Sequence, residues 1–250
     1  MHSVWPAPPR TARSFTPLSR RQPISGHPTS LPILQDYFEI LVRSYGPQKW
    51  WPGRTRFEII VGAILTQNTS WTNVEGAILA LRRHRLLSPG AIARTSITEL
   101  APLIRSSGYF RQKARKLKEF VAFLDIQYQG SLNKMFRTPT ALLREQLLAV
   151  HGIGPETADS ILLYAGNHPV FVVDAYTRRI LQRHGLAHGK ETYEEIRALF
   201  EKSLPRDTVM FNEFHALIVH VGKCFCRPKS PQCSACPLQS FLPQGIEVSR

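Results

Sequence analysis

The chain has 250 residues, of which 43% are hydrophobic, so it is long enough and apolar enough to bury a substantial core. Lysine and arginine number 32 against 18 acidic residues, and this charge of +14 favours a polyanionic partner such as nucleic acid over a merely soluble basic protein. No apolar run approaches the roughly 18 residues that a membrane-spanning helix needs, which argues against a membrane protein.

Residues 1–30 differ in composition from the rest of the chain. They are rich in proline, serine, threonine and arginine, and the first acidic residue is Asp36. The segment has no apolar core of a secretory signal, and its prolines oppose the amphipathic helix of an organellar transit peptide. We therefore expect a disordered basic tail on a cytoplasmic, nucleoid-associated protein, with organellar targeting by this segment as the open alternative.

After this tail the hydrophobic pattern is helical almost throughout. Apolar residues recur at helical spacing in segments such as 117–124. Residues 96–99 have the pattern of a capping box, and Pro139 and Pro155 are each predicted to occupy the first position of a helix. The strand-like run 170–173 is too isolated to build a sheet. The sequence therefore predicts an all-α protein with about nine or ten helices.

The segment around residue 152 predicts two helices joined by a tight turn. A helix ends near Val150, His151-Gly152-Ile153-Gly154 follows, and the next helix opens at Pro155. Two glycines around one apolar residue allow a turn with exposed backbone N–H groups, and Ile153 can fill the gap between the helices. With the N-terminus of the second helix, these groups can bind a phosphate oxygen, although an ordinary tight turn has the same spacing.

Asp174 ends an apolar run twenty residues after Gly154, and a helix follows it. An aspartate in this position commonly caps a helix, which is the simpler interpretation. In combination, however, the hairpin and Asp174 resemble the HhH-GPD family of DNA glycosylases. The resemblance extends over about residues 31–240. It is also carried by Ile64-Leu65-Thr66-Gln67-Asn68-Thr69, by Gly108-Tyr109-Phe110 with Lys113 and Ala114, and by a C-terminal group of cysteines.

The resemblance implies two helical lobes with a helix-hairpin-helix motif and a C-terminal cysteine cluster loop. Residues 51–168 would form a six-helix barrel domain that contains the motif at about 142–165. Residues 31–50 and 169–250 would form the second helical domain, with the cysteine loop at 224–242.

The resemblance also implies a mechanism. Double-stranded DNA would bind to a monomer, and the damaged nucleotide would be flipped into a cleft between the lobes. There Asp174 would stabilise positive charge on the deoxyribose, as a fixed carboxylate can do for an oxocarbenium-like state. Gln67 would fill the gap that the flipped base leaves. The other residues implied to bind DNA are His151, Gly152, Ile153, Gly154, Thr157 and Lys113.

Glu156 occupies a position that distinguishes two kinds of glycosylase. Endonuclease III carries a lysine two residues after the last glycine of its hairpin, and this lysine attacks the sugar. A carboxylate cannot form a Schiff base, so we predict a monofunctional enzyme. Glu156 is either a first-turn residue that the helix dipole favours or a second catalytic acid. The alternative functions are an endonuclease III-type glycosylase and AP lyase for oxidised pyrimidines, and a non-catalytic DNA-binding protein.

Tryptophans suggest which base is removed. Lys49-Trp50-Trp51-Pro52 and Trp71 resemble the endonuclease III-like 3-methyladenine glycosylases, in which two aromatic residues sandwich the extruded base. Trp50 and Trp71 would form this sandwich, and Trp51 would join the base pocket, unless the three belong to the core. Indole faces attract a cationic alkylated purine by about 0.5–2 kcal/mol per contact, and such a base leaves without a general acid.

All four cysteines lie between Cys224 and Cys236, which favours ligands for a metal over scattered disulfides. Cys226, Cys233 and Cys236 resemble the first three ligands of the family's [4Fe–4S] loop, but Leu242 stands where the fourth is expected. Cys224 could take the vacant corner. The alternatives are a cluster with three cysteines and one outside ligand, a zinc site with four cysteines, and a loop without metal.

Overall fold

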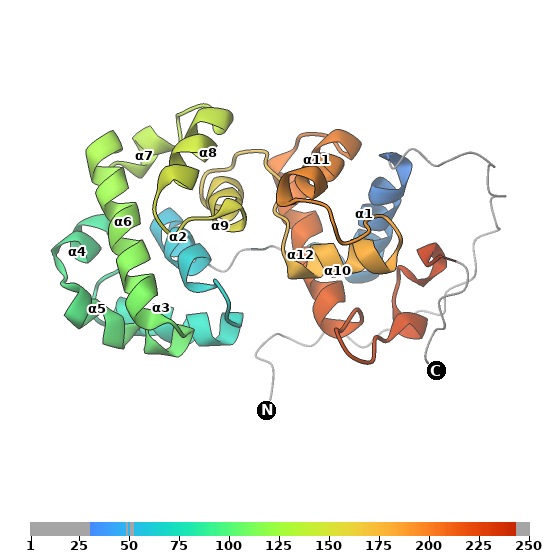
Figure 1. The fold of residues 1–250 in the computed structure, drawn as a ribbon, viewed down its shortest axis with the longest axis horizontal. Coiled ribbons are helices and arrows are strands. Elements are labelled where there is room, and N and C mark those ends of the chain that lie inside the picture. Colours follow the sequence, from blue (N-terminus) through green and yellow to red (C-terminus); the bar gives the residue numbers. More distant parts are fainter. Residues whose placement is uncertain (1–30, 49, 51–52, 244–250) are drawn as a thin grey trace.

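The structure is a computed structural model that describes residues 31–48, 50 and 53–243 (Figure 1). The expected basic tail, residues 1–30, and Trp51 lie outside the described residues. Within the described ranges the regular structure is helical and no strand occurs, which confirms the all-α prediction. In the same ranges, no helix is both long enough and apolar enough to cross a bilayer.

The described part of the chain forms twelve α-helices, more than the sequence predicted. Helices as short as α4 and α7, with 6 and 4 residues, are too short for hydrophobic periodicity to reveal them. The α-helices are α1 (Leu31–Tyr45), α2 (Arg56–Leu65), α3 (Trp71–Arg83), α4 (Pro89–Arg94), α5 (Ile97–Leu103), α6 (Phe110–Tyr128), α7 (Leu132–Met135), α8 (Thr140–Ala149), α9 (Pro155–Ser160), α10 (Ala175–Arg183), α11 (Tyr193–Ser203) and α12 (Thr208–Cys224). The shorter helical turns are η1 (Arg105–Ser107), the π-helical η2 (Ile161–Ala165), η3 (Cys233–Ala235) and η4 (Gln239–Phe241).

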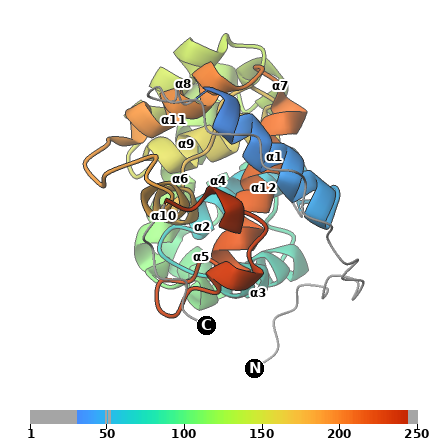
Figure 2. The same cartoon turned by 90° about the vertical axis from the view of Figure 1, so that its right-hand side faces the viewer.

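The helices bury two separate hydrophobic cores, one in each of two lobes (Figure 1). The first lobe, α2–α9, buries side chains between Phe57 and Val170. The second lobe combines α1 with α10–α12, and Figure 2 shows α1 alongside α12. The helix formed by α9 and η2 belongs to both lobes, because Leu162 packs in the first core whereas Leu163 packs in the second. This shared helix fixes the spacing between the two lobes.

Local sequence signals place two of the three predicted helix starts correctly. Ser96 and Glu99 form the predicted capping box, with reciprocal side-chain and backbone hydrogen bonds. Pro155 lies in the first turn of α9, as predicted. Pro139 does not, because its ψ of 142° is extended and the helix begins one residue later at Thr140. Residues 170–173 form neither a helix nor a strand, and they lead directly to Asp174.

Candidate active site

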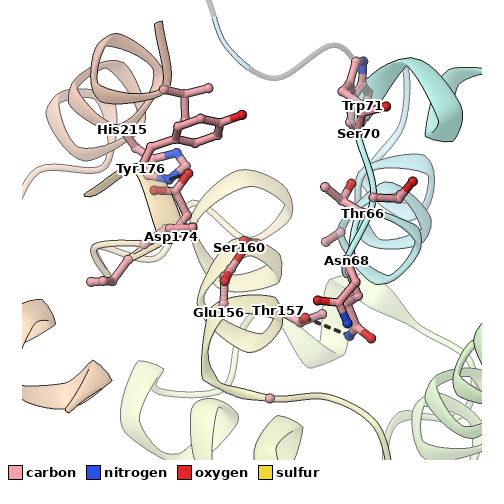
Figure 3. Close-up of a pocket in the computed structure, with 18 of the residues that line it drawn as sticks. Thr66, Asn68, Ser70, Trp71, Glu156, Thr157, Ser160, Asp174, Tyr176 and His215 are labelled. Carbon is pink, nitrogen blue, oxygen red and sulfur yellow. Dashed lines mark hydrogen bonds and ion pairs between the residues drawn. The ribbon is translucent and has the colours of Figure 1, made fainter. Parts of the chain in front are cut away.

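A cleft of about 1770 Å³ lies between the two lobes. Its walls come from the turn after α2, from the hairpin between α8 and α9, from the start of α10 and from the C-terminal half of α12. Figure 3 shows residues of α9 in the middle of this cleft, with Asp174, Tyr176 and His215 on one side and Thr66, Asn68 and Trp71 on the other. The hairpin and the carboxylate that the sequence identified therefore face one space.

The hairpin has the backbone that its glycines predict. Gly152 has a φ of +86°, and the side chain of Lys116 crosses directly over it. Ile153 is only 4% exposed and packs in the first core, as expected for the residue between the two helices. Gly154 is extended and is the N-cap residue of α9, while His151 is exposed at the cleft. The arrangement leaves the turn open on its cleft side.

We expect Gly152→Ala to destabilise the hairpin. A positive φ costs an alanine about 1–2 kcal/mol, and the new Cβ would lie 2.5 Å from Cγ of Lys116. Gly154→Ala is the matched control, because Gly154 has a φ of −91° and an added Cβ would meet no atom within 4 Å. The control should lose only about 0.5 kcal/mol through the weaker N-cap. Chemical denaturation gives the free energy of unfolding of both variants. Equal losses of this free energy would contradict a specific requirement for glycine at position 152.

Gln67 connects the turn after α2 to the hairpin. Its Nε2 donates to the carbonyl oxygen of Gly152 at 3.0 Å and to Oγ1 of Thr157 at 2.9 Å. The ammonium of Lys116 donates to the other end of the same amide. The structure thus brings together three residues that the sequence assigned to DNA binding. These hydrogen bonds hold Gln67 against the hairpin.

Asp174 is the N-cap residue of α10 as well as a wall of the cleft. Its Oδ1 accepts hydrogen bonds from the backbone N and Oγ1 of Thr177, at 2.8 and 2.9 Å. Its Oδ2 lies 3.5 Å from Nε2 of His215, whose Nδ1 is 2.5 Å from the hydroxyl of Tyr164. The two interpretations of Asp174 in the sequence, helix cap and functional carboxylate, are therefore compatible: one oxygen caps, and the other faces a histidine.

The surroundings of Asp174 keep it ionised. Burial alone would raise the pKa of Asp174, but the attraction of His215 and the hydrogen bonds from Thr177 outweigh burial and hold the pKa below its ordinary value. The side chain is 12% exposed, so it reaches the cleft without being freely hydrated. A charge held this way can stabilise a cation that develops in the cleft.

Glu156 lies in the first turn of α9 and lines the same cleft. Desolvation by the surrounding cleft walls and the negative charge of Asp174 raise the pKa of Glu156 to about 6, against the opposing effects of His215 and Arg178. Two carboxyl groups in one cleft therefore have pKa values displaced in opposite directions. The simple helix-dipole interpretation of Glu156 does not explain this difference.

Lys113 is a correction to the expected DNA-binding set. The side chain is 2% exposed, and its ammonium donates to the carbonyl oxygens of Leu65 at 2.8 Å and Ser107 at 2.6 Å. Burial, with a smaller contribution from Lys116, lowers the pKa of Lys113 to about 8. Lys113 therefore joins the end of α2 to η1 inside the first lobe and faces no groove. A run of basic residues on a helix does not show which of its members is buried.

The tryptophans assigned to the base pocket lie on different lobes. Trp50 packs against the second core and Trp71 against the first, and both line the cleft. The indole Nε1 of Trp71 donates to Oε1 of Glu75 at 3.0 Å, which fixes the ring at the rim.

The cysteines do not gather as a set of four. Cys226, Cys233 and Cys236 line a small pocket together with Leu242, but its volume of about 10 Å³ is no more than a water molecule needs. Cys224 lines the large cleft instead. Among the described residues, no three or more histidine, cysteine, aspartate or glutamate side chains are arranged to hold a metal ion.

The residues present therefore do not fit a [4Fe–4S] cluster with four cysteine ligands, because Cys224 lines a different cavity from the other three cysteines. Other contacts hold the loop in place. Arg183 donates to the sulfur of Cys226 at 3.2 Å, Arg179 donates to its carbonyl oxygen at 2.6 Å, and Leu238 is fully buried below.

Sequence reasoning missed His215, Tyr164 and Tyr176, which line or support the site. His215 is a lone histidine in the apolar helix α12, and such a residue carries no signal of its own. Thr177 could have been found, because an aspartate followed three residues later by a donor is typical of a capped helix start.

Comparison with known proteins extends over most of the chain. A Methanocaldococcus jannaschii protein named as a DNA repair glycosylase is 47% identical over 84% of this chain and 95% of its own. The endonuclease III of Thermotoga maritima is 31% identical over 74% of this chain and 81% of its own. The 3-methyladenine DNA glycosylase of H. pylori, solved with bound 1,N6-ethenoadenine, matches at 30% identity and a TM-score of 0.65, covering 78% of this chain and 97% of its own.

A structure of endonuclease III in a non-covalent complex with DNA matches with a TM-score of 0.73 at 23% identity, which shows the fold alone, over 88% of this chain and 97% of that one. With the relatives above, the fold and the cleft define a DNA repair glycosylase. The chain belongs to the HhH-GPD superfamily of base excision DNA repair proteins, which matches residues 61–206, more than half of it. It is an enzyme, a DNA N-glycosylase, and the predicted family is confirmed.

Proposed function

We propose that the chain is a monofunctional glycosylase that releases alkylated purines from double-stranded DNA and acts as a monomer. The observation that carries this proposal is that Trp50 and Trp71, from opposite lobes, line one cleft with the ionised Asp174. The two indole faces attract a cationic purine that lies between them. When the purine departs, the carboxylate stabilises the positive charge that develops on the sugar. The 3-methyladenine glycosylase of H. pylori supports this choice of substrate.

The open face of the hairpin supports a role in holding the strand. Its backbone and the start of α9 lie beside Asp174 in the cleft, so a phosphate bound there would place the neighbouring sugar near the carboxylate. His151, Gly152 and Gly154 are the residues that would contact it. Gln67, released from its bonds to Gly152 and Thr157, would then fill the space of the flipped base.

The test of this function is incubation with randomly methylated duplex DNA, followed by chromatography of the freed bases. We expect 3-methyladenine and other cationic purines among them, with the sugar-phosphate backbone left uncut. Release of oxidised pyrimidines alone, from a second substrate carrying them, would contradict the proposal.

A glycosylase with lyase activity is the second candidate, and Lys223 is the observation that favours it. Lys223 lines the cleft, and burial lowers its pKa although Asp174 opposes the change. Glu156 stands where endonuclease III has its lysine, so a Schiff base would have to use another amine. Borohydride trapping on abasic DNA decides between the two: we expect no cross-link, and a cross-link that Lys223→Gln removes would favour the lyase.

A further inference from the structure

We propose that Glu156 is a second catalytic residue, the proton donor that lets the enzyme release neutral damaged purines as well as cationic ones. This inference deepens the proposed function and rests on it. A cationic alkylated base leaves with its charge neutralised, so it needs no proton. A neutral base departs as an anion unless an acid protonates it in the same step, and Asp174, which is ionised, cannot serve.

The position of Glu156 is suited to this task. It projects from α9, between the wall that bears Asp174 and the wall that bears Trp71 (Figure 3). The side chain keeps access to solvent, so it can exchange protons without a buried relay. It also belongs to the same short helix as Thr157, which Gln67 anchors, so its backbone is fixed relative to the hairpin.

Charged and titratable groups from several neighbouring elements interact with Glu156. They are Asp174, the N-cap of α10, Arg178 of α10, His215 of α12, Tyr164 of η2 and Tyr193 of α11. Asp174 disfavours a second negative charge, whereas Arg178 and His215 favour one. Desolvation in the cleft is the largest influence and, together with Asp174, it raises the pKa of Glu156 to about 6, whereas the pKa of Asp174 is lowered. Paired carboxyl groups with separated pKa values divide into a proton donor and a charged stabiliser.

The proposed step balances as follows. The O–H bond of Glu156 breaks as the glycosidic C–N bond breaks, and the electron pair of that bond stays with the base, which gains the proton. Asp174 stabilises the sugar cation. Water then bonds to the anomeric carbon, and its spare proton returns to the carboxylate of Glu156. The products are the free base, an abasic site and the enzyme in its starting protonation state.

The experiment compares duplexes of one sequence that carry either 7-methylguanine, which is cationic, or a neutral purine, hypoxanthine or 1,N6-ethenoadenine. Single-turnover base release is followed from pH 5 to 7, where 7-methylguanine keeps its positive charge, with spontaneous loss subtracted. For at least one neutral purine we expect the rate to fall about tenfold per pH unit above the pKa of Glu156, while release of 7-methylguanine changes little. Glu156→Gln should remove the acid-dependent release of the neutral purine and retain that of 7-methylguanine.

Matched variants separate this role from a structural one. Glu156→Asp should restore part of the pH dependence, and Glu145→Gln, at an exposed position on α8 outside the cleft, should change neither substrate. Equal losses on both substrates in Glu156→Gln, no release of either neutral purine, or rates that rise through pH 6 for both substrates would overturn the proposal. Failure to release 7-methylguanine would instead contradict the proposed function.

Discussion

Asp174→Asn should reduce base release about a hundredfold to a thousandfold while the fold and DNA binding are retained. Asparagine caps a helix about as well as aspartate, so the hydrogen bonds to Thr177 can persist. The substitution removes the negative charge that, in the proposed mechanism, stabilises the sugar cation. It also removes the electrostatic partner of His215, 3.5 Å away. Single-turnover release of 7-methylguanine, with DNA affinity measured separately, checks this expectation.

A second N-cap aspartate provides the control. Asp207 caps α12 by accepting from the backbone N of Met210 at 2.7 Å, and it lies outside the cleft. Asp207→Asn removes the charge of a capping aspartate that lies outside the cleft, so the rate of base release should be unchanged. Wild-type release by Asp174→Asn would remove Asp174 from the mechanism, and a matching loss in Asp207→Asn would show that capping alone had been disturbed.

Features encoded in consecutive residues could be predicted from the sequence. The turn at Gly152 and the helix start at Pro155 depend on backbone preferences of the residues themselves, and both occur as expected. Asp174 could be placed because a helix begins directly after it. The two lobes followed from family resemblance, since local periodicity does not tell which helices share a core.

Features that depend on packing between distant segments could not be predicted. His215 reaches Asp174 only because α12 packs against α10. Lys113 lies on the buried side of α6, where two carbonyl groups satisfy its ammonium, and a run of basic residues does not show which member faces inward. Cys224 is separated from Cys226 by one residue, yet it is the last residue of α12 and lines the other cavity. Spacing alone had suggested a shared site.

Asp159→Ala should destabilise the protein by about 3–5 kcal/mol, because it would leave Arg144 without its buried partner. Asp159 is fully buried on α9, and Arg144 on α8 bonds both of its oxygens, at 2.7 and 3.1 Å. Burial raises the pKa of Asp159 even against this guanidinium, so the pair pays a desolvation cost that only mutual pairing offsets. Replacing both residues, in Arg144→Met with Asp159→Leu, should therefore recover much of the loss.

The same substitution should also affect Asp174, the carboxylate that we propose acts in catalysis. Tyr193 interacts with Asp159, and its hydroxyl accepts from the backbone N of Val173, the residue before Asp174, at 3.3 Å. We therefore expect Asp159→Ala to lower both the free energy of unfolding, by urea denaturation, and the rate of base release below the denaturation midpoint. Glu194→Gln is the control, because Glu194 is half-exposed where it meets Arg144 and should cost less than about 1 kcal/mol. If Glu194→Gln lowered the free energy of unfolding as much as Asp159→Ala, the stability would come from the ion pair of Arg144 with Glu194. The buried pair of Arg144 with Asp159 would then not be the interaction that holds α8 and α9 in place relative to Asp174.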